Sequence, residues 1–399
     1  MRCWQNFFGI IGSLLLVGFM IINPTLTIKS AAQGISLWYH LVLPALFPFF
    51  VASELLVQLG FVRLIGSLLE PATRPFFRLP GSSSVVIVMG FTSGFPVGAF
   101  LTRRLLEERL LTTEEAERLV SFTNNASPLF ILGTVASGMF GFREVGYVLA
   151  VSHYLSNLTV GFIWGRLAAG RETDNSYLEN RGRWNKMSFL QQLQACQDRP
   201  VSFGQIMGDS IRKGIASIAG VGGFIVMFSV ITSMLQCLGL LDLIARFLQK
   251  AALGLHLPYS LAYGLGIGLF EMTLGTRSIT SSEAPLVQQL VAVSAVMAWS
   301  GLSIISQVMS IVAGTPVRLS SYLRSRLLQM GLACVFTYIA YLAVFGKRTL
   351  EAFPANLPFD PASCSSGFAA HVYLLIMVVM VLVLACVLSA ALKFVVSRR

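Results

Sequence analysis

The stretch GFTSGFPVG at residues 90–98 interrupts a long apolar run, and GLGIGLFEMTLG at residues 264–275 interrupts a second one. Gly94 and Pro96 disfavour a continuous helix, and Pro96 pushes the residue before it toward an extended conformation. Glu271 places a carboxylate in the middle of the second stretch. Within a membrane, backbone groups that lose their helical partners cannot face lipid. We therefore predict two broken or re-entrant helices that face protein or a water-filled cavity.

The glycines of the first stretch allow a second interpretation. Gly90, Gly94 and Gly98 follow the GxxxG spacing, which lets neighbouring membrane helices approach closely without any break. We favour the broken helix, because the first stretch contains a proline and the second contains a glutamate.

The composition of the chain is that of a membrane protein. Of its 399 residues, 55% are hydrophobic and only 12% are charged, with a mean hydropathy of +0.73. Soluble globular proteins carry about 25% charged residues, which excludes an ordinary soluble enzyme. The length suits a bundle of roughly eight to ten helices of about 20 apolar residues. We expect the net charge of +11 in cytoplasmic loops, with no nucleic-acid partner.

The basic residues predict the topology. If every apolar run crossed the membrane, the arginine-rich connections 103–118 and 171–213 would both lie outside, against the positive-inside tendency. If the two interrupted stretches enter and return on one side, there are eight crossings and both termini are cytoplasmic. Arg109 is then cytoplasmic and Arg277 external. We interpret residues 7–22 as a retained first span rather than a signal peptide.

Similar sequences flank the two interrupted stretches. Leu79-Pro80 precedes the first by the same distance as Leu257-Pro258 precedes Gly268, and long apolar runs flank both. Residues of about 34–140 and 210–315 therefore look like two copies of one unit in opposite orientations. Inverted repeats with interrupted helices indicate a binding site near the bilayer midplane. The predicted parts are an N-terminal span (1–33), a first repeat (34–167), a cytoplasmic linker (168–209), a second repeat (210–315) and C-terminal spans (316–399).

Polar groups inside these runs are the candidate site. Glu271 could bind a cation or polar ligand or carry a proton, or it could be neutral and structural. Hydroxyl groups in the first stretch could cap freed backbone or contact a ligand, and a helix starting after Pro96 would offer N–H groups to an anionic or polar ligand. Asn124 and its neighbours could recognise a polar ligand or join helices. The candidate residues are Thr92, Ser93, Gly94, Pro96, Asn124, Asn125, Ser127, Glu271, Thr273, Ser300 and Ser303.

Other chemistry finds little support in the sequence. The six cysteines and four histidines are scattered, without metal-ligand spacing, a hydrolase motif or a P-loop. We predict no catalytic residue, metal or cofactor, and therefore no enzyme. The segment Thr112–Glu115 has the form of a capping box, which predicts a helix starting near Thr113. His153 and Asn157 share one helix face, where we interpret the histidine as a packing group.

Three motifs resemble a known family. SGFPVGA at 93–99, NNASPLFILG at 124–133 and GLFEMTLG at 268–275 resemble the nucleoside-recognition (Gate) membrane family, and within it the YlbJ-type sporulation integral membrane proteins. The resemblance implies an all-α, polytopic membrane helix bundle with two gate-like repeats in a bacterial cell or spore membrane. It also implies a transporter-like role in spore cortex formation, with an unknown small polar solute or ion.

The resemblance leaves a second role open. A non-transporting scaffold could organise the membrane during sporulation, in contact with the lipid bilayer and other sporulation membrane proteins. It predicts that changes in the linker around Arg171–Arg199 harm function more than changes at Glu271 or Asn125.

Overall fold

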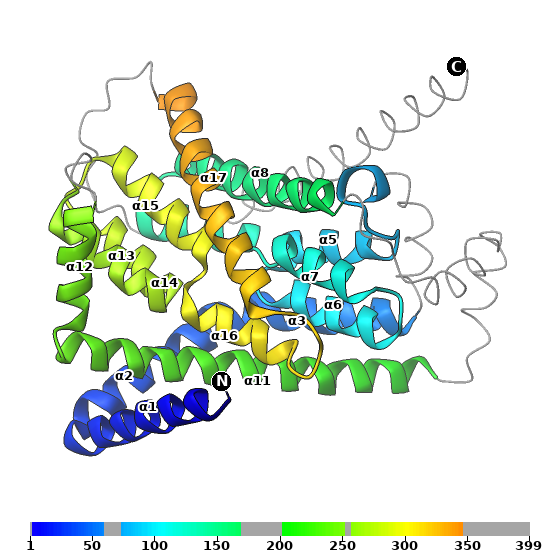
Figure 1. Ribbon diagram of the computed structural model, residues 1–399, viewed down its shortest axis with the longest axis horizontal. Coiled ribbons are helices and arrows are strands. Elements are labelled where there is room, and N and C mark those ends of the chain that lie inside the picture. Colours follow the sequence, from blue (N-terminus) through cyan, green and yellow to red (C-terminus); the bar gives the residue numbers. More distant parts are fainter. Residues whose placement is uncertain (1, 60–72, 169–201, 252–256, 346–399) are drawn as a thin grey trace.

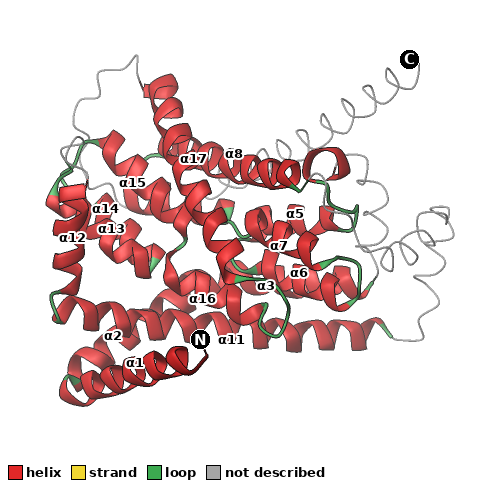
Figure 2. Cartoon of the chain, in the orientation of Figure 1, coloured by secondary structure: helices red, strands yellow, loops and turns green. Residues whose placement is uncertain are grey.

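The computed structural model describes residues 2–59, 73–168, 202–251 and 257–345, and every regular element in these ranges is a helix (Figure 2). The predicted all-α bundle is therefore confirmed. The elements before the predicted linker are α1 (Arg2–Ile22), α2 (Pro24–Leu37), the π-helix η1 (Trp38–Val42), α3 (Leu43–Gln58), α5 (Ser83–Ser93), α6 (Val97–Glu107), α7 (Thr113–Thr123), the π-helix η2 (Leu129–Phe140) and α8 (Arg143–Leu167). Those after it are α11 (Phe203–Cys237), α12 (Leu240–Ala251), α13 (Tyr259–Phe270), α14 (Met272–Thr280), α15 (Leu286–Trp299), α16 (Gly301–Ile311) and α17 (Leu319–Phe345).

Helix α11 runs along one side of the molecule and organises its neighbours (Figure 1). Helices α2 and α3 pack on it, α16 contacts it further along, and α1 lies at its outer side. Helix α17 crosses the opposite part of the bundle and packs against α15, α8 and α7. The two long helices α11 and α17 therefore contact different sets of the shorter helices.

Several described helices have the length and composition of membrane spans. These are α11, the Leu286–Ile311 segment formed by α15 and α16, and α17; α1 and α2 form a fourth candidate, bent by 108°. The bend follows from Asn23, which ends α1, and Pro24, which cannot continue it. The predicted first span is thus extended by a second, bent helix. The number of crossings stays a prediction, and most of the linker and the expected last span at 372–394 lie outside the described residues.

Two helix starts follow from side-chain capping. The Thr112 hydroxyl accepts from the backbone N–H of Glu115 at 3.3 Å, and the Glu115 carboxylate accepts from the N–H of Thr112 at 2.9 Å. This confirms the predicted capping box and the start of α7 at Thr113. A second capping box, between Ser202 and Gln205, starts α11. Each box satisfies backbone donors that the first turn of a helix leaves unpaired.

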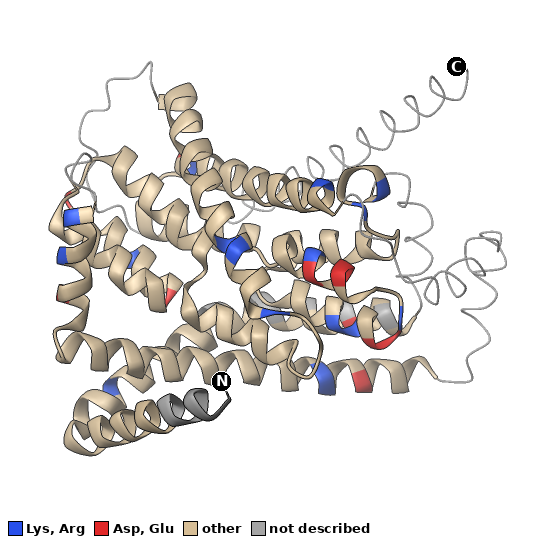
Figure 3. Ribbon diagram, in the orientation of Figure 1, with Lys and Arg blue, Asp and Glu red and all other residues tan. Residues whose placement is uncertain are grey.

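Charged side chains gather on α6, on α7 and at the start of α11, whereas much of the remaining helical surface is uncharged (Figure 3). Two contacts there join the first half of the chain to the second. Arg103 of α6 donates to the carbonyl of Ile311 at 2.7 Å. The Glu117 carboxylate accepts from Arg318 at 2.9 and 3.0 Å and from the Ser321 hydroxyl at 3.0 Å. We call this second contact the Glu117–Arg318 clamp.

The Glu117–Arg318 clamp lowers the pKa of Glu117. Partial burial tends to raise the pKa of Glu117, but the hydrogen bonds from Arg318 and Ser321 outweigh it and hold the pKa below the ordinary glutamate value. The carboxylate is therefore ionised at neutral pH and remains paired with the guanidinium.

Candidate functional site

The first interrupted stretch is a helix, a break and a second helix, as predicted. Helix α5 ends at Ser93, and α6 begins at Val97. Gly94 between them has φ = +91°, which a residue with a side chain rarely adopts, and the Phe95–Pro96 bond is cis. The Thr92 hydroxyl bonds back to the carbonyl of Val88 at 2.9 Å. The Ser93 hydroxyl is buried and makes no hydrogen bond to any described residue.

A second break lies directly against the first. Helix α7 ends at Thr123, the next residues are not helical, and the π-helix η2 begins at Leu129 after Pro128. A Cβ on Gly94 would stand 2.8 Å from the Cβ of Ser127. A Cβ on Gly90 or Gly98 would stand 2.2 or 2.5 Å from the Thr123 carbonyl oxygen. The glycines thus serve both interpretations of the sequence, since the helix breaks and its arms also pack closely.

Asn124 connects these two breaks. Its Oδ1 accepts from the backbone N–H of Ala99 at 2.9 Å, and its Nδ2 donates to the carbonyl of Val120 at 2.8 Å. Ala99 is the third residue of α6, so Asn124 supplies a side-chain cap to a helix other than its own. Asn125 is fully buried and donates to the carbonyl of Phe122 at 3.2 Å, while its Oδ1 has no partner among the described residues.

A buried arginine holds the end of α7. Arg326 of α17 is 0% exposed and donates to the backbone carbonyls of Asn124, at 3.0 Å, and Ser121. It also lies 3.4 Å from Oδ1 of Asn157 on α8. The last carbonyls of a helix carry partial negative charge and lack intrahelical donors, so the guanidinium satisfies both needs. No salt bridge of Arg326 to a carboxylate occurs among the residues described.

Sequence reasoning did not single out Arg326. The available signal was the spacing of the polar residues along α17. Tyr322, Arg326, Gln329 and Thr337 recur at helical intervals and are all buried, whereas the rest of that helix is mostly apolar and exposed. A polar stripe on an apolar helix points toward the interior of a bundle.

His153 behaves largely as a packing group. It is fully buried, and its Nε2 accepts from the backbone N–H of Ala126 at 3.1 Å. The neighbouring Tyr154 donates to the carbonyl of Ala126 at 3.0 Å. Both backbone groups of Ala126, inside the break after α7, are therefore satisfied by α8.

The second interrupted stretch breaks at Glu271, as predicted. Helix α13 ends at Phe270 and α14 begins at Met272. The Glu271 side chain is 3% exposed and accepts from the backbone N–H of Leu274 at 2.6 Å, which makes it the N-cap of α14. Thr273 also bonds to this carboxylate. The structure thus shows Glu271 in a capping contact.

A fourth break lies against the third. Helix α15 ends before Ser300, which has φ = +75° and a fully buried side chain. A Cβ on Gly301 would stand 3.0 Å from both the Met272 nitrogen and the Phe270 carbonyl oxygen. Ser303, one turn further, accepts from Gln307 at 3.3 Å. The sequence analysis expected a continuous apolar run here. Residues around Ser300 contain no proline, whereas Pro128 follows the corresponding break after α7.

The predicted residues therefore form two groups. Thr92, Ser93, Gly94 and Pro96 adjoin Asn124, Asn125 and Ser127 in the first half, and Glu271 and Thr273 adjoin Ser300 in the second. The two groups are connected through the second helix of each broken pair. Helix α6 of the first half contacts α16 of the second, and α14 of the second half contacts η2 of the first. Among the described residues, no three His, Cys, Asp or Glu side chains are grouped as a metal site requires. A single path lined by both groups stays a prediction.

Comparison with known proteins gives two kinds of match. The family model described as nucleoside recognition (Gate) matches residues 40–143. The sporulation integral membrane protein YlbJ of Bacillus subtilis is 37% identical over 335 residues, which cover 83% of this chain and 82% of that protein. An uncharacterised protein of Alkalihalophilus pseudofirmus is 29% identical over 160 residues, or 39% of this chain and 34% of that protein. No solved structure matches.

Proposed function

Because the chain belongs to the YlbJ family of sporulation integral membrane proteins, we propose that it is a transporter-like protein of the bacterial cell or spore membrane that moves a small polar solute or ion during spore formation. One observation carries this proposal. In each half, an interrupted helical hairpin meets an interrupted span at the point where both helices break. Such paired interruptions inside an apolar bundle supply backbone polar groups that need a polar partner.

The capping pattern supports the same proposal. In α6 and in α14, the third backbone N–H is bonded by a side-chain oxygen, from Asn124 and Glu271 respectively. Of the preceding N–H groups, that of Val97 bonds to the carbonyl of Gly94 at 3.1 Å and that of Thr273 bonds to the Glu271 carboxylate. A polar solute that binds at the break would replace these local contacts. The second helix of each hairpin, α6 or α14, also contacts the other half of the chain. Movement of one hairpin would therefore displace helices in the other half. This arrangement needs no nucleotide and no catalytic residue.

The direct test is transport by the purified full chain in proteoliposomes. We expect uptake of at least one member of a panel of nucleosides, monovalent and divalent cations and cell-wall precursors. Glu271→Gln and Asn125→Ala should reduce it, since both change buried polar atoms at the breaks. Glu107→Gln, in an exposed intrahelical ion pair of α6, is the matched control and should transport normally. Absence of uptake for the whole panel counts against the proposal.

A cell assay separates transport from a scaffold role. Spore heat resistance is measured for Glu271→Gln and Asn125→Ala, and for charge-reversing changes in the linker around Arg171–Arg199. A transporter predicts that the two buried substitutions are the more harmful. The reverse order, with normal resistance in both buried variants, supports the scaffold.

Cysteine labelling tests the predicted orientation. Single cysteines replacing Arg109 and Arg277 should react from the cytoplasmic and the external side, respectively, if the two hairpins enter the membrane from opposite faces. Arg109 follows α6, the second helix of the first hairpin, and Arg277 lies in the last turn of α14, the second helix of the other hairpin. Labelling of both from the same side would remove the inverted arrangement on which alternating access depends.

A further inference from the structure

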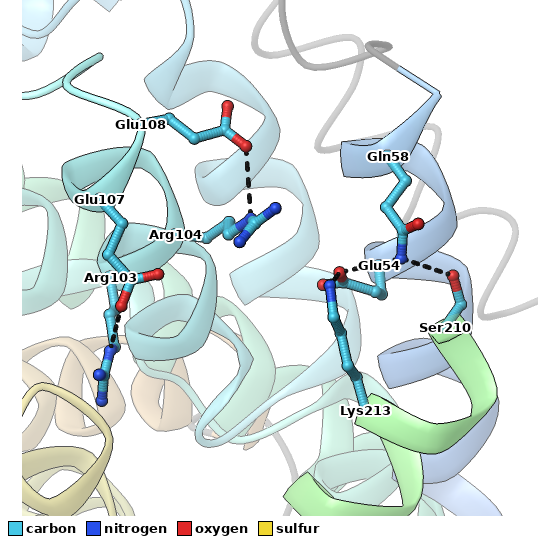
Figure 4. Close-up of polar contacts among 8 residues, drawn as sticks. All are labelled: Glu54, Gln58, Arg103, Arg104, Glu107, Glu108, Ser210 and Lys213. Atoms are coloured by element: carbon cyan, nitrogen blue, oxygen red, sulfur yellow. Dashed lines mark hydrogen bonds and ion pairs between the residues drawn. The ribbon is translucent and has the colours of Figure 1, made fainter. Parts of the chain in front are cut away.

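A half-buried ion pair outside the broken helices joins the first spans of the two halves. The Glu54 side chain, on α3, is 1% exposed, and its Oε1 contacts Nζ of Lys213 on α11 (Figure 4). Gln58 donates to the same Oε1 at 3.1 Å and lies 3.2 Å from the Ser210 hydroxyl. The partner of the buried Glu54 carboxylate is thus Lys213.

The two members of this pair differ sharply in their exposure at the molecular surface. The Lys213 side chain is 45% exposed, whereas Glu54 is enclosed. Glu54 Oε2 is buried and makes no hydrogen bond to any residue that the structure describes. The lysine can therefore leave the contact toward solvent, but the glutamate cannot follow it.

Departure of the lysine has an electrostatic consequence. It would leave an unpaired carboxylate in an apolar environment, and a buried unpaired charge is so unfavourable that the group takes up a proton instead. We propose that Glu54 is a proton-binding site: it accepts a proton from water when Lys213 moves out, and it returns the proton when Lys213 comes back. Lys213 keeps its own proton throughout, so the site gains one positive charge on each opening.

Among the residues that the structure describes, no other charge near Glu54 is positioned to replace Lys213. Helix α5, which packs on α3, has no ionisable residue, and His40 on η1 lies 14 positions away along the chain. On α11, Asp209 and Arg212 are exposed and lie 3.8 Å from each other.

Helix α6 also lies beside α3, through the ring contact of Phe50 with Phe100. Its charges, however, already form pairs along the helix, Arg103 with Glu107 at 2.7 Å and Arg104 with Glu108 at 3.3 Å (Figure 4). Glu54 Oε2 is therefore the one buried carboxylate oxygen of this pair without a partner among the described residues, and a proton is the ligand that fits it.

The position of the pair suggests the side from which the proton arrives. Glu54 lies near the end of α3 and Lys213 near the start of α11. In the predicted topology both ends are cytoplasmic. The pair also bridges the first spans of the two repeats, so its opening would loosen the contact between them. Use of this proton as a coupling ion rests on the proposed transport function, whereas its binding does not.

The test compares thermal unfolding of wild type and Glu54→Gln, as full chains in detergent, from about pH 8 down to about pH 4. At high pH the wild type should melt at a higher temperature, because Glu54→Gln lacks the ion pair. The difference should disappear on acidification, because the wild type then protonates Glu54 and loses the same pair. A difference that stays constant to the lowest pH overturns the proposal. Glu107→Gln is the matched control for an exposed glutamate–arginine pair.

Two further measurements keep the test decisive. If Glu54→Gln does not fold, Lys213→Met is used, and difference infrared spectra at neutral pH should show a carboxylic-acid band absent from wild type; its absence overturns the proposal. Sodium chloride is also compared with choline chloride at equal concentration. A sodium-specific rise in melting temperature that Glu54→Gln abolishes would reject the proton in favour of a metal cation. No solute is added, so failure here is distinct from failure of transport.

Discussion

The hairpins α5–α6 and α13–α14 break at corresponding places, but they are closed in different ways. At the first break, the N-terminal turn of α6 is capped by Asn124 of the adjoining span. At the second, the turn of α14 is capped by Glu271 of the hairpin itself. The close glycine contacts differ in part, although Gly268 of the second hairpin also faces the Val296 side chain of α15. Gly90 and Gly98 face the carbonyl of Thr123 on α7, whereas Gly275 faces Gly268 of its own hairpin.

This difference indicates how each hairpin can move. The first hairpin is capped by Asn124 at the end of α7 and makes its tightest glycine contacts with Thr123 of the same helix. We therefore expect this hairpin and α7 to move as one body. The second hairpin carries its own cap and packs arm against arm. A shift against α15 would therefore keep the cap and would break the hydrogen bond from the Trp299 indole to the carbonyl of Leu269, at 3.1 Å. We expect the α13–α14 hairpin to be the more mobile element of the two.

The largest effect is expected from adding a methyl group at the glycines. Gly90→Ala would place a Cβ 2.2 Å from a backbone oxygen, and Gly275→Ala 2.4 Å from a backbone Cα. Neither neighbour can rotate away, so each should lose at least about 3 kcal/mol of unfolding free energy, measured by denaturation in detergent. Gly223→Ala, with no atom within 4 Å, is the control and should be neutral or slightly stabilising. A tolerated Gly90→Ala would show that the first hairpin and α7 are not tightly joined.

The caps should give an intermediate effect. Asn124→Ala and Glu271→Ala each remove the acceptor of a third-residue N–H, which should cost about 1–2 kcal/mol. Glu271→Gln keeps an acceptor oxygen and should cost less. Labelling of a cysteine in α6 should increase in Asn124→Ala, because that cap joins two elements, and labelling in α14 should change less in Glu271→Ala. Equal changes in both would contradict the difference between the hairpins.

The smallest effect is expected at the Glu117–Arg318 clamp, because the Arg318 side chain is 65% exposed and solvent screens the pair. The pKa of Glu117 is held below its ordinary value, so the clamp stabilises the folded state at neutral pH. That contribution is lost as the pH falls through the lowered pKa. The melting temperature of Arg318→Ala should therefore fall below wild type near neutral pH and approach it in acid. Asp209→Asn, in a looser exposed pair, should show no such convergence.

The sequence allowed accurate prediction wherever a local rule decided the structure. The capping box fixed the start of α7 at Thr113, and Pro96 and Glu271 marked two of the breaks. These features depend on residues only a few positions apart. The break at Ser300 escaped notice, because Ser300 and Gly301 are unremarkable in sequence and become special only through their positive φ angles.

Contacts between distant elements could not be predicted in the same way. Asn124 was identified as polar and buried, but its role as a cap for α6 depends on a neighbour 25 residues away. The burial of Arg326 was not predicted, because the positive-inside rule describes where arginines lie on average, whereas three acceptors at the end of α7 and on α8 hold this particular arginine inside. Both errors concern the partner that a polar group finds, which only the packed structure determines.

The length of α11 has a consequence for how the protein sits in its membrane. With 35 residues it is about 52 Å long, while the hydrocarbon core of a bilayer is about 30 Å thick. It must therefore tilt or extend into water at one end, and its angle will change with the thickness of the surrounding lipid. Because α2, α3 and α16 all rest on this rod, shorter or longer acyl chains would tilt them together. Lipid chain length is thus an experimental control over the whole bundle.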